Sequence, residues 1–245
     1  MSADRLLRVQ AELLLPDEIT AALAERSLVY VPLGSIEYHS HHLPVGLDGL
    51  NGHGVCTHAA ARGGGIVLPT LYYGVGGGHT SYPWTIMAAS SAPLVSLVEQ
   101  ALQRLEDFGV KLAVLFTGHF APEQLALIDD VADRWNAGSG DLRVMALAVN
   151  RTDAPLAADH AGVFETTLLS ALWPDLVRLD RLPSVAEIPD PDPEGVVGYD
   201  HRHDPDHVLW GVMGPDPRHF DPSKAAELLD QVVSWVTAEI TRHGT

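Results

Sequence analysis

A group of carboxylate and imidazole side chains follows the first apolar run of the chain. The run LVYVPL (28–33) leads directly into GSIEYHSHHLPVGLD (34–48), which contains Glu37, His39 and Asp48. Glu37 and His39 are two residues apart, so their side chains share one face if the segment is extended. A proline and a glycine before Asp48 allow the chain to turn back toward them. Carboxylate oxygens beside imidazole nitrogens suit Zn²⁺ or Mn²⁺, so we expect a metal site here.

Two later segments carry side chains of the same types. His119 comes directly after the apolar run KLAVLF (111–116), and His160 and Glu165 lie in the segment DHAGVFETT (159–167). A single histidine is more often an ordinary loop residue, and Glu165 could simply favour the start of a helix through the helix dipole. Together with the first group, however, these residues favour a shared metal site over ordinary loop polarity.

The elements that would position these residues alternate along the chain between strand and helix. Buried apolar runs predict strands at 28–33, 66–68, 111–116 and 142–149. Helical spacing, capping residues and breakers predict helices at 16–25, about 49–62, 91–108, 122–135, 162–172 and 221 to about 242. This order predicts one layered α/β domain over residues 1–245, with a mostly parallel sheet flanked by helices. In such sheets ligands bind beyond the carboxyl ends of the strands, which is where the polar residues fall.

Two segments show no regular pattern. The glycine-rich stretch GVGGGHTSYPW (74–84) gives no secondary-structure prediction, and residues 184–209, rich in Pro, Asp and His, predict a long loop. That loop could cover an active site or contact another subunit. His79, in the glycine-rich stretch, could orient a substrate or could be a bystander.

The amino-acid composition limits the classes of binding partner. Asp and Glu number 32 against 15 Lys and Arg, which gives a formal net charge of −17. This field would repel nucleic acid and anionic membranes, although it could also serve only to keep the protein soluble. Cys56 is the only cysteine, so neither an intrachain disulfide nor a thiolate metal cluster can form. The N-terminal stretch is too short and interrupted for a signal peptide or membrane span, which predicts a cytoplasmic protein.

The motifs also carry a family resemblance. The segment 34–48 resembles the GSxEQHGPHLPLGTD signature of the creatininase (creatinine amidohydrolase) family. TGHF (117–120) is similar to the family's NGH turn, HAGVFETTLL (160–169) to its HAGxxETSLML segment, and GVMGPDP (211–217) to its GVxGDP. These similarities occur in the family's order and span most of the chain.

The resemblance implies a role for each matching position. Glu37, His39, Asp48 and His119 match metal ligands of the family, with Asp48 bridging two ions, either Zn, Mn or one of each. His160 matches a histidine that moves a proton to the leaving nitrogen. The family also implies a small-molecule substrate and a homo-oligomer, with a hexamer as one candidate.

The chain departs from the family pattern at other positions. Creatininase has a metal-binding Glu two residues after the histidine of the NGH turn, where this chain has Ala121. We expect Glu165 to replace that ligand, and we expect a protein other than creatininase in the strict sense. Trp84 stands where the family's FPGT loop has glycine, and we expect it, with His79 and Phe120, to shape the substrate site. Trp84 could equally be packing surface.

Three functions remain open from the sequence. The resemblance favours a metal-dependent amidohydrolase that cleaves a C–N bond, other than a peptide bond, in a small amide such as a cyclic one. A hydrolase of another activated carbonyl, such as a lactone or a cyclic keto compound, is an alternative because of Ala121 and Trp84. A non-catalytic metal-binding maturation protein is the third reading, and it predicts bound metal without turnover.

Overall fold

The structure, a computed structural model, describes residues 3–77, 81–196, 198 and 200–243. Its centre is a four-stranded parallel sheet with the strand order β2-β1-β5-β6. The strands are β1 (Leu28–Leu33), β2 (Ile66–Val67), β5 (Leu112–Thr117) and β6 (Arg143–Ala148). The register pairs Leu33 of β1 with Thr117 of β5, so these strands end side by side. The predicted α/β class with a parallel sheet is therefore confirmed.

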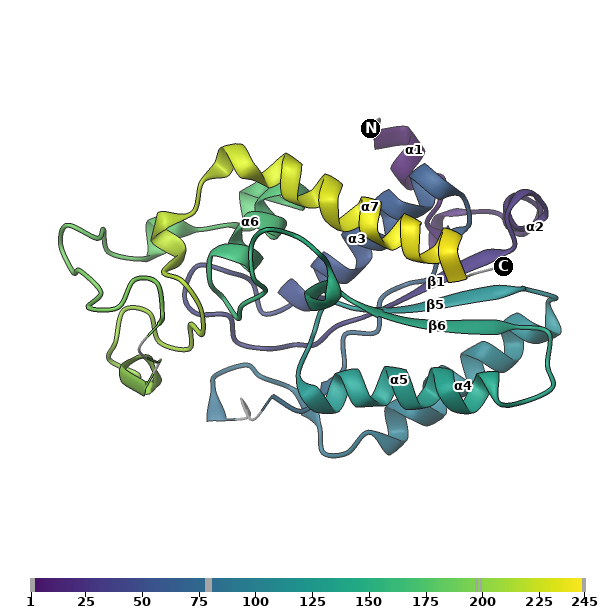
Figure 1. Cartoon of the computed structure of the whole chain (residues 1–245), viewed down its shortest axis with the longest axis horizontal. Coiled ribbons are helices and arrows are strands. Elements are labelled where there is room, and N and C mark those ends of the chain that lie inside the picture. The colour runs from purple at the N-terminus through teal and green to yellow at the C-terminus, as the bar shows by residue number, and fades with distance from the viewer. Residues whose placement is uncertain (1–2, 78–80, 197, 199, 244–245) are drawn as a thin grey trace.

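Helices cover both faces of the sheet (Figure 1). On one face lie α3 (Leu47–Gly63), α6 (Val163–Leu172) and α7 (Ala225–His243), and on the other lie α4 (Ala92–Asp107) and α5 (Pro122–Asn136). Alternation along the strands explains the two layers: Tyr30 packs in the cluster with α3 and α7, whereas Val29 and Val31 pack in the cluster with α4 and α5. Both strand faces are apolar because both are covered.

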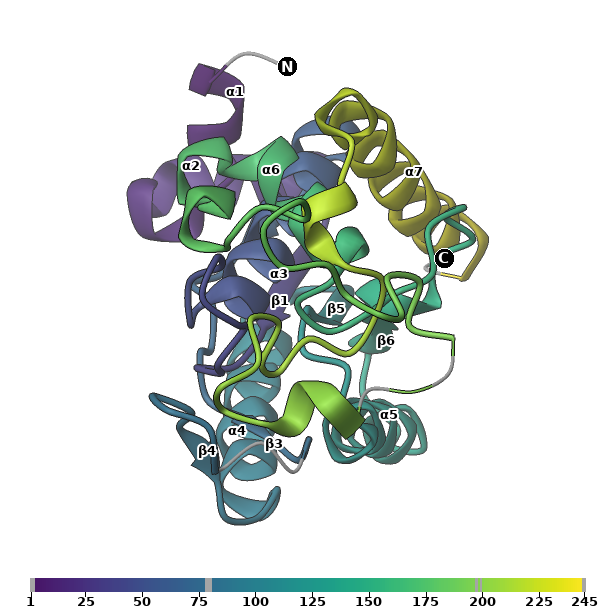
Figure 2. The same cartoon turned by 90° about the vertical axis from the view of Figure 1, so that its left-hand side faces the viewer.

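Smaller elements surround this core. They are α1 (Ala3–Leu7), α2 (Pro16–Glu25) and a two-stranded parallel ribbon of β3 (Gly74–Val75) and β4 (Met87–Ala88). A third apolar cluster, which includes Leu43, Leu182 and Val212, packs the segment after α6 against the loop after β1. Figure 2 looks toward the carboxyl ends of the strands, and this later segment lies in front of them. Among the described residues, no helix combines the length and apolar character needed to cross a membrane.

Several boundaries differ from the sequence prediction. Helix α3 begins at Leu47, two residues early, so Asp48 lies in its first turn rather than in the preceding loop. Residues Pro222–Lys224 form a 3-10 turn, capped by the Asp221 side chain, before α7 begins at Ala225. The helix α1 and the ribbon β3–β4 were not predicted, because their segments are too short for a periodic pattern. Within 184–209 the described residues contain only a 3-10 turn, Asp200–His203.

Candidate metal centre

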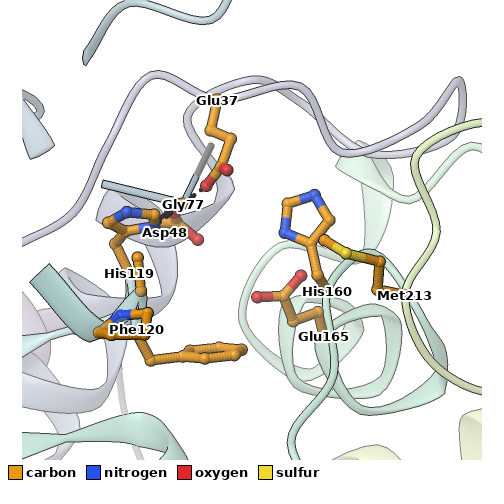
Figure 3. Close-up of a pocket in the computed structure, with 10 residues that line it drawn as sticks. Glu37, Asp48, Gly77, His119, Phe120, His160, Glu165 and Met213 are labelled. Carbon is orange, nitrogen blue, oxygen red and sulfur yellow. Dashed lines mark ion pairs between the residues drawn. The ribbon is translucent and has the colours of Figure 1, made fainter. Parts of the chain in front are cut away.

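The carboxyl ends of β1 and β5 open into a cavity of about 240 Å³. Glu37 comes from the loop after β1, His119 from the loop after β5, Asp48 from the first turn of α3, and Glu165 from the first turn of α6 (Figure 3). His160 precedes α6 and faces the same space. The described lining consists of Glu37, Asp48, Gly77, His119, Phe120, Ala121, Pro122, His160, Glu165 and Met213.

Two glycines make this convergence possible. A Cβ on Gly34 would lie 2.2 Å from the backbone nitrogen of Gly49, and a Cβ on Gly118 would lie 2.0 Å from the carbonyl oxygen of Asp48. No side chain fits at either position, so the ends of β1 and β5 approach the first turn of α3 through bare backbone. This close approach is what brings Asp48 beside the two strand-end loops.

Asp48 faces two imidazoles with two different oxygens. Its Oδ1 is 3.2 Å from Nε2 of His39, and its Oδ2 is 3.2 Å from Nδ1 of His119. Each imidazole has a second carboxylate neighbour: Glu165 Oε2 lies 3.6 Å from His39 Nε2, and Glu37 Oε2 lies 3.0 Å from His119 Nδ1. Two three-donor groups therefore share Asp48, and the donor atoms of each lie within 4.8 Å of one another.

Neighbouring groups hold these side chains in place. The backbone carbonyl of Glu37 is 2.9 Å from Nδ1 of His39, and because a carbonyl only accepts, that nitrogen carries the proton. Nε2 of His39 then faces the carboxylates of Asp48 and Glu165, and it makes no hydrogen bond with the described residues although it is buried. Ser35 donates to Oδ2 of Asp48 at 2.5 Å. Such outer contacts are typical of residues that orient metal ligands.

The electrostatics are those of a buried acidic site. Burial disfavours a charged His39, yet the carboxylates of Asp48, Glu165 and Glu37 outweigh burial and raise its pKa to about 10. Burial likewise opposes charge on His119, and Asp48 and Glu37 raise its pKa to about 10. The pKa of Glu165 rises well above its ordinary value, first because of burial. Three carboxylates buried together need positive charge to offset the loss of hydration, which protons or metal ions can supply.

The start of α6 fixes Glu165 and His160. The buried carboxylate of Asp159 accepts hydrogen bonds from the backbone N–H groups of Gly162, Phe164 and Glu165, which would otherwise lack partners at the helix start. Burial outweighs these bonds and raises the pKa of Asp159 to about 7. Ala161, held at a φ of 55°, donates its N–H to Glu165 Oε2 at 2.7 Å. Positive φ at a non-glycine residue is strained backbone, and such strain is common at functional sites.

A backbone hydrogen bond anchors the His160 ring at Nε2. Its Nε2 lies 3.0 Å from the backbone carbonyl of Tyr38, so Nε2 is the donor of that hydrogen bond. The His160 ring lies against the His39 ring, with centroids 4.4 Å apart. His160 also belongs to a third possible ligand group with Glu37 and His39.

The residues expected at the substrate site fall in different places. Phe120 lines the cavity, and so does Ala121, which stands where creatininase has a ligand Glu. Trp84 does not: its side chain is 79% exposed, and it is absent from the described lining. Its φ of 58° lies in the left-handed region, which glycine adopts readily, and this fits the glycine that the family's FPGT loop has at this position. His79 lies outside the described residues.

Several residues of the centre were not predicted from the sequence. Ser35, Asp159, Gly77 and Met213 contact or line it. Ser35 and Asp159 lie inside recognised motifs, and this place in the sequence could have marked them as residues near the centre. Met213 also lies inside a recognised motif, GVMGPDP (211–217), but it carries no polar group that would have marked it as a site residue.

Fold and centre together define a class: a layered α/β protein with a buried carboxylate–imidazole centre at the carboxyl edge of its parallel sheet. The family model described as creatinine amidohydrolase matches residues 12–240, so the chain belongs to the creatininase family. Family members are hydrolases. The resemblance stated from the motifs is confirmed.

Individual relatives agree with this assignment. Creatinine amidohydrolase of Pseudomonas putida is 33% identical over 177 residues, which cover 63% of this chain and 68% of the relative. A mycofactocin precursor peptide peptidase of Mycolicibacterium smegmatis is 30% identical over 161 residues, covering 63% of this chain and 62% of the relative.

Solved structures extend the likeness over nearly the whole chain. A crystal structure of creatinine amidohydrolase (creatininase) superposes with a TM-score of 0.77 at 27% identity, covering 96% of this chain and 97% of the other. A structure described as creatininase Mn gives a TM-score of 0.76 at 26% identity, covering 96% and 98%.

Proposed function

We propose that this chain is a metal-dependent amidohydrolase that cleaves a C–N bond of a small, uncharged amide. The observation that carries the proposal is the sharing of Asp48 between two donor groups, one completed by Glu37 and His119 and the other by His39 and Glu165. One carboxylate facing two ligand sets is the geometry of a two-metal site.

The donor chemistry fits two divalent ions. Each group offers two carboxylates and one imidazole, a set that suits Zn²⁺ or Mn²⁺. The buried Nε2 of His39, which has no hydrogen bond to the described residues, supports its assignment as a ligand atom. Ions held there would supply hydroxide at neutral pH and would polarise the carbonyl oxygen of the substrate. In this proposal Glu165 takes the ligand role that Ala121 cannot fill.

His160 is the proposed proton donor to the leaving nitrogen. Because its Nε2 donates to the Tyr38 carbonyl, Nδ1 is the ring atom that takes up and releases a proton. Imidazole titrates close to neutral pH, so His160 can accept a proton during attack and deliver it to the departing amine. The backbone bond to Tyr38 keeps the ring oriented through both steps.

The cavity favours a substrate without negative charge. No lysine or arginine is among the described residues that line it, and the stretches outside the described residues contain neither. Phe120, Ala121, Pro122 and Met213 supply apolar wall. A carboxylate or phosphate on the substrate would therefore find no basic side chain to pair with, whereas a compact neutral ring would bury its faces on this wall.

A second candidate is cleavage of a peptide bond. It is favoured by the similarity to the mycofactocin precursor peptide peptidase of Mycolicibacterium smegmatis. The same ligands and the same proton transfer would serve it, because a peptide bond is also an amide. The two candidates differ only in what lies beyond the scissile group.

Hydrolysis assays on stripped and reloaded protein test the proposal. The protein is treated with a chelator, dialysed, reloaded with Zn²⁺ or Mn²⁺, and offered cyclic ureas, lactams, formamides, dipeptides and lactones. We expect release of amine from at least one neutral amide by the reloaded protein only. Turnover that survives stripping would contradict metal dependence, and hydrolysis of lactones alone would contradict the amide assignment. Bound metal without turnover on the whole panel would favour the non-catalytic reading.

A further inference from the structure

Arg202 is a fully buried guanidinium outside the proposed ligand set. It belongs to the segment 184–216, which follows α6 and lies over the carboxyl edge of the sheet, and both its side chain and that of Asp190 are 0% exposed. Burying an arginine is costly unless its donors are satisfied in a defined geometry. An apolar side chain could pack this segment without the desolvation cost of a buried charge, so stability alone does not explain the guanidinium.

The contacts of Arg202 join three points of the segment. Its Nε donates to Asp190 Oδ2 at 3.2 Å, its Nη2 to the carbonyl of Asp192 at 2.8 Å, and its Nη1 to the carbonyl of Gly214 at 2.5 Å. A guanidinium is planar and its donors point in fixed directions. These bonds therefore set the position of the Gly214 carbonyl, and not only its distance from the early part of the segment.

Gly214 leads directly to the candidate catalytic histidine. It follows Met213, which lines the cavity and pairs with His160 as an isolated antiparallel bridge. Both bonds of that bridge, His160 N–H to Met213 O and Met213 N–H to His160 O, measure 2.9 Å. The backbone of His160 is thus held by a strand whose next carbonyl is held by Arg202.

We propose that Arg202 is a positioning residue for His160, acting through Gly214 and Met213. The proposal rests on the role of His160 in the proposed amide hydrolysis, but the backbone coupling it describes exists independently of that role. Arg202 touches neither the cavity nor the ligand groups among the described residues, so its effect on turnover would pass through the Met213–His160 bridge.

A second buried pair in the same segment offers a matched control. Arg218 pairs with Asp216 at 2.7 Å and donates to the carbonyls of Pro183 and Ile188, so it ties down the other side of the segment. The side chains of this pair are 5% and 0% exposed, close to those of Arg202 and Asp190. The double variants D190N/R202M and D216N/R218M each remove one ion pair without leaving a buried lone charge. Arg202→Lys keeps the charge but loses the planar donor set, and it serves if the double variant folds poorly.

Hydrogen exchange and kinetics are measured together on the full chain. In D190N/R202M we expect the amides of His160 and Met213 to exchange at least ~10-fold faster, with strands β1 and β5 unchanged. Bound metal should stay at the wild-type level, while kcat on the amide found in the panel falls about 10- to 100-fold at a nearly constant KM. Arg202→Lys should give exchange rates and a kcat between those of wild type and D190N/R202M. The control D216N/R218M should exchange at the wild-type rate at His160 and Met213.

Unchanged exchange at His160 and Met213 in D190N/R202M would overturn the proposal, whatever the activity. Equal losses in the two double variants would also overturn it, because they would indicate a general loosening of the segment. If wild-type protein hydrolyses nothing in the panel, the proposed function fails, and the exchange data alone decide whether Arg202 positions the His160 backbone.

Discussion

At the scale of single residues, the centre depends on which atom each side chain presents. His39 is fixed at Nδ1 by a backbone carbonyl and presents Nε2, whereas His119 presents Nδ1 to Glu37 and Asp48. His160 is held at Nε2 by the Tyr38 carbonyl, so in our proposal its Nδ1 is the atom that takes up and releases a proton. In our account His39 and His119 are therefore metal ligands through different ring atoms, whereas His160 transfers protons.

His160→Gln separates proton transfer from metal binding. Glutamine keeps an N–H for the Tyr38 carbonyl but cannot shuttle a proton, so we expect kcat to fall about 10²- to 10⁴-fold with bound metal unchanged. Steady-state kinetics and elemental analysis on the same samples measure both quantities. Loss of one ion per chain in this variant would instead make His160 a ligand, in line with its third group with Glu37 and His39.

At the scale of elements, the site depends on how closely strand ends and helix starts approach one another. Gly118, directly after β5, lies against the first turn of α3, where a Cβ would lie 2.0 Å from the carbonyl oxygen of Asp48. The loops that carry Glu37 and His119 can converge on Asp48 only because this contact is made by backbone.

Gly118→Ala tests that close approach. The methyl group would push β5 and α3 apart, so we expect a loss of about 1–3 kcal/mol in the free energy of unfolding and weaker metal binding. Urea titration and metal analysis measure the two effects. Gly63→Ala, in the same helix α3, is the control, because its Cβ would meet only Thr237 at an ordinary 3.6 Å. Wild-type stability and metal content in Gly118→Ala would contradict the account.

The length and regularity of each element decided whether it could be predicted from the sequence. The parallel sheet followed from buried apolar runs such as 28–33 and 111–116, and the position of the polar residues followed from the carboxyl-end rule. The short strands Gly74–Val75 and Met87–Ala88 could not be predicted, because two residues show no periodicity. The place of Met213 in the cavity wall and the buried contacts of Arg202 could not be predicted either, since both depend on long-range packing of an irregular segment. Trp84 was placed by family pattern alone, and it is largely exposed and absent from the described cavity lining.

At the scale of the whole molecule, the dominant property is negative charge. The formal net charge is −17, and the basic residues lie outside the described cavity lining. This field lowers the local concentration of anionic substrates and leaves them without a basic partner in the site. Metal ions at the centre would offset the charge of Glu37, Asp48 and Glu165, but they would add no basic side chain to pair with a carboxylate or phosphate elsewhere on the substrate.

Paired substrates of similar size test this selection by charge. A neutral amide and its carboxylated counterpart should differ at least ~10-fold in kcat/KM in favour of the neutral one, and the gap should narrow as salt is added. Competition between the two in one reaction gives the ratio directly. Preference for the carboxylated amide would contradict the proposal of a neutral substrate, but it would not contradict the proposed metal site.

The most direct test of the central claim is the metal content of wild type and of Asp48→Asn, with the exposed Asp133→Asn as control. All three proteins are stripped, reloaded with Zn²⁺ or Mn²⁺, dialysed and measured by elemental analysis, with circular dichroism to show that they are folded. Our account predicts about two ions per chain in wild type and Asp133→Asn, and fewer than about one in Asp48→Asn, because both donor groups lose their shared carboxylate. A folded wild type that retains no metal, or an Asp48→Asn that retains as much as wild type, would contradict the shared two-metal centre.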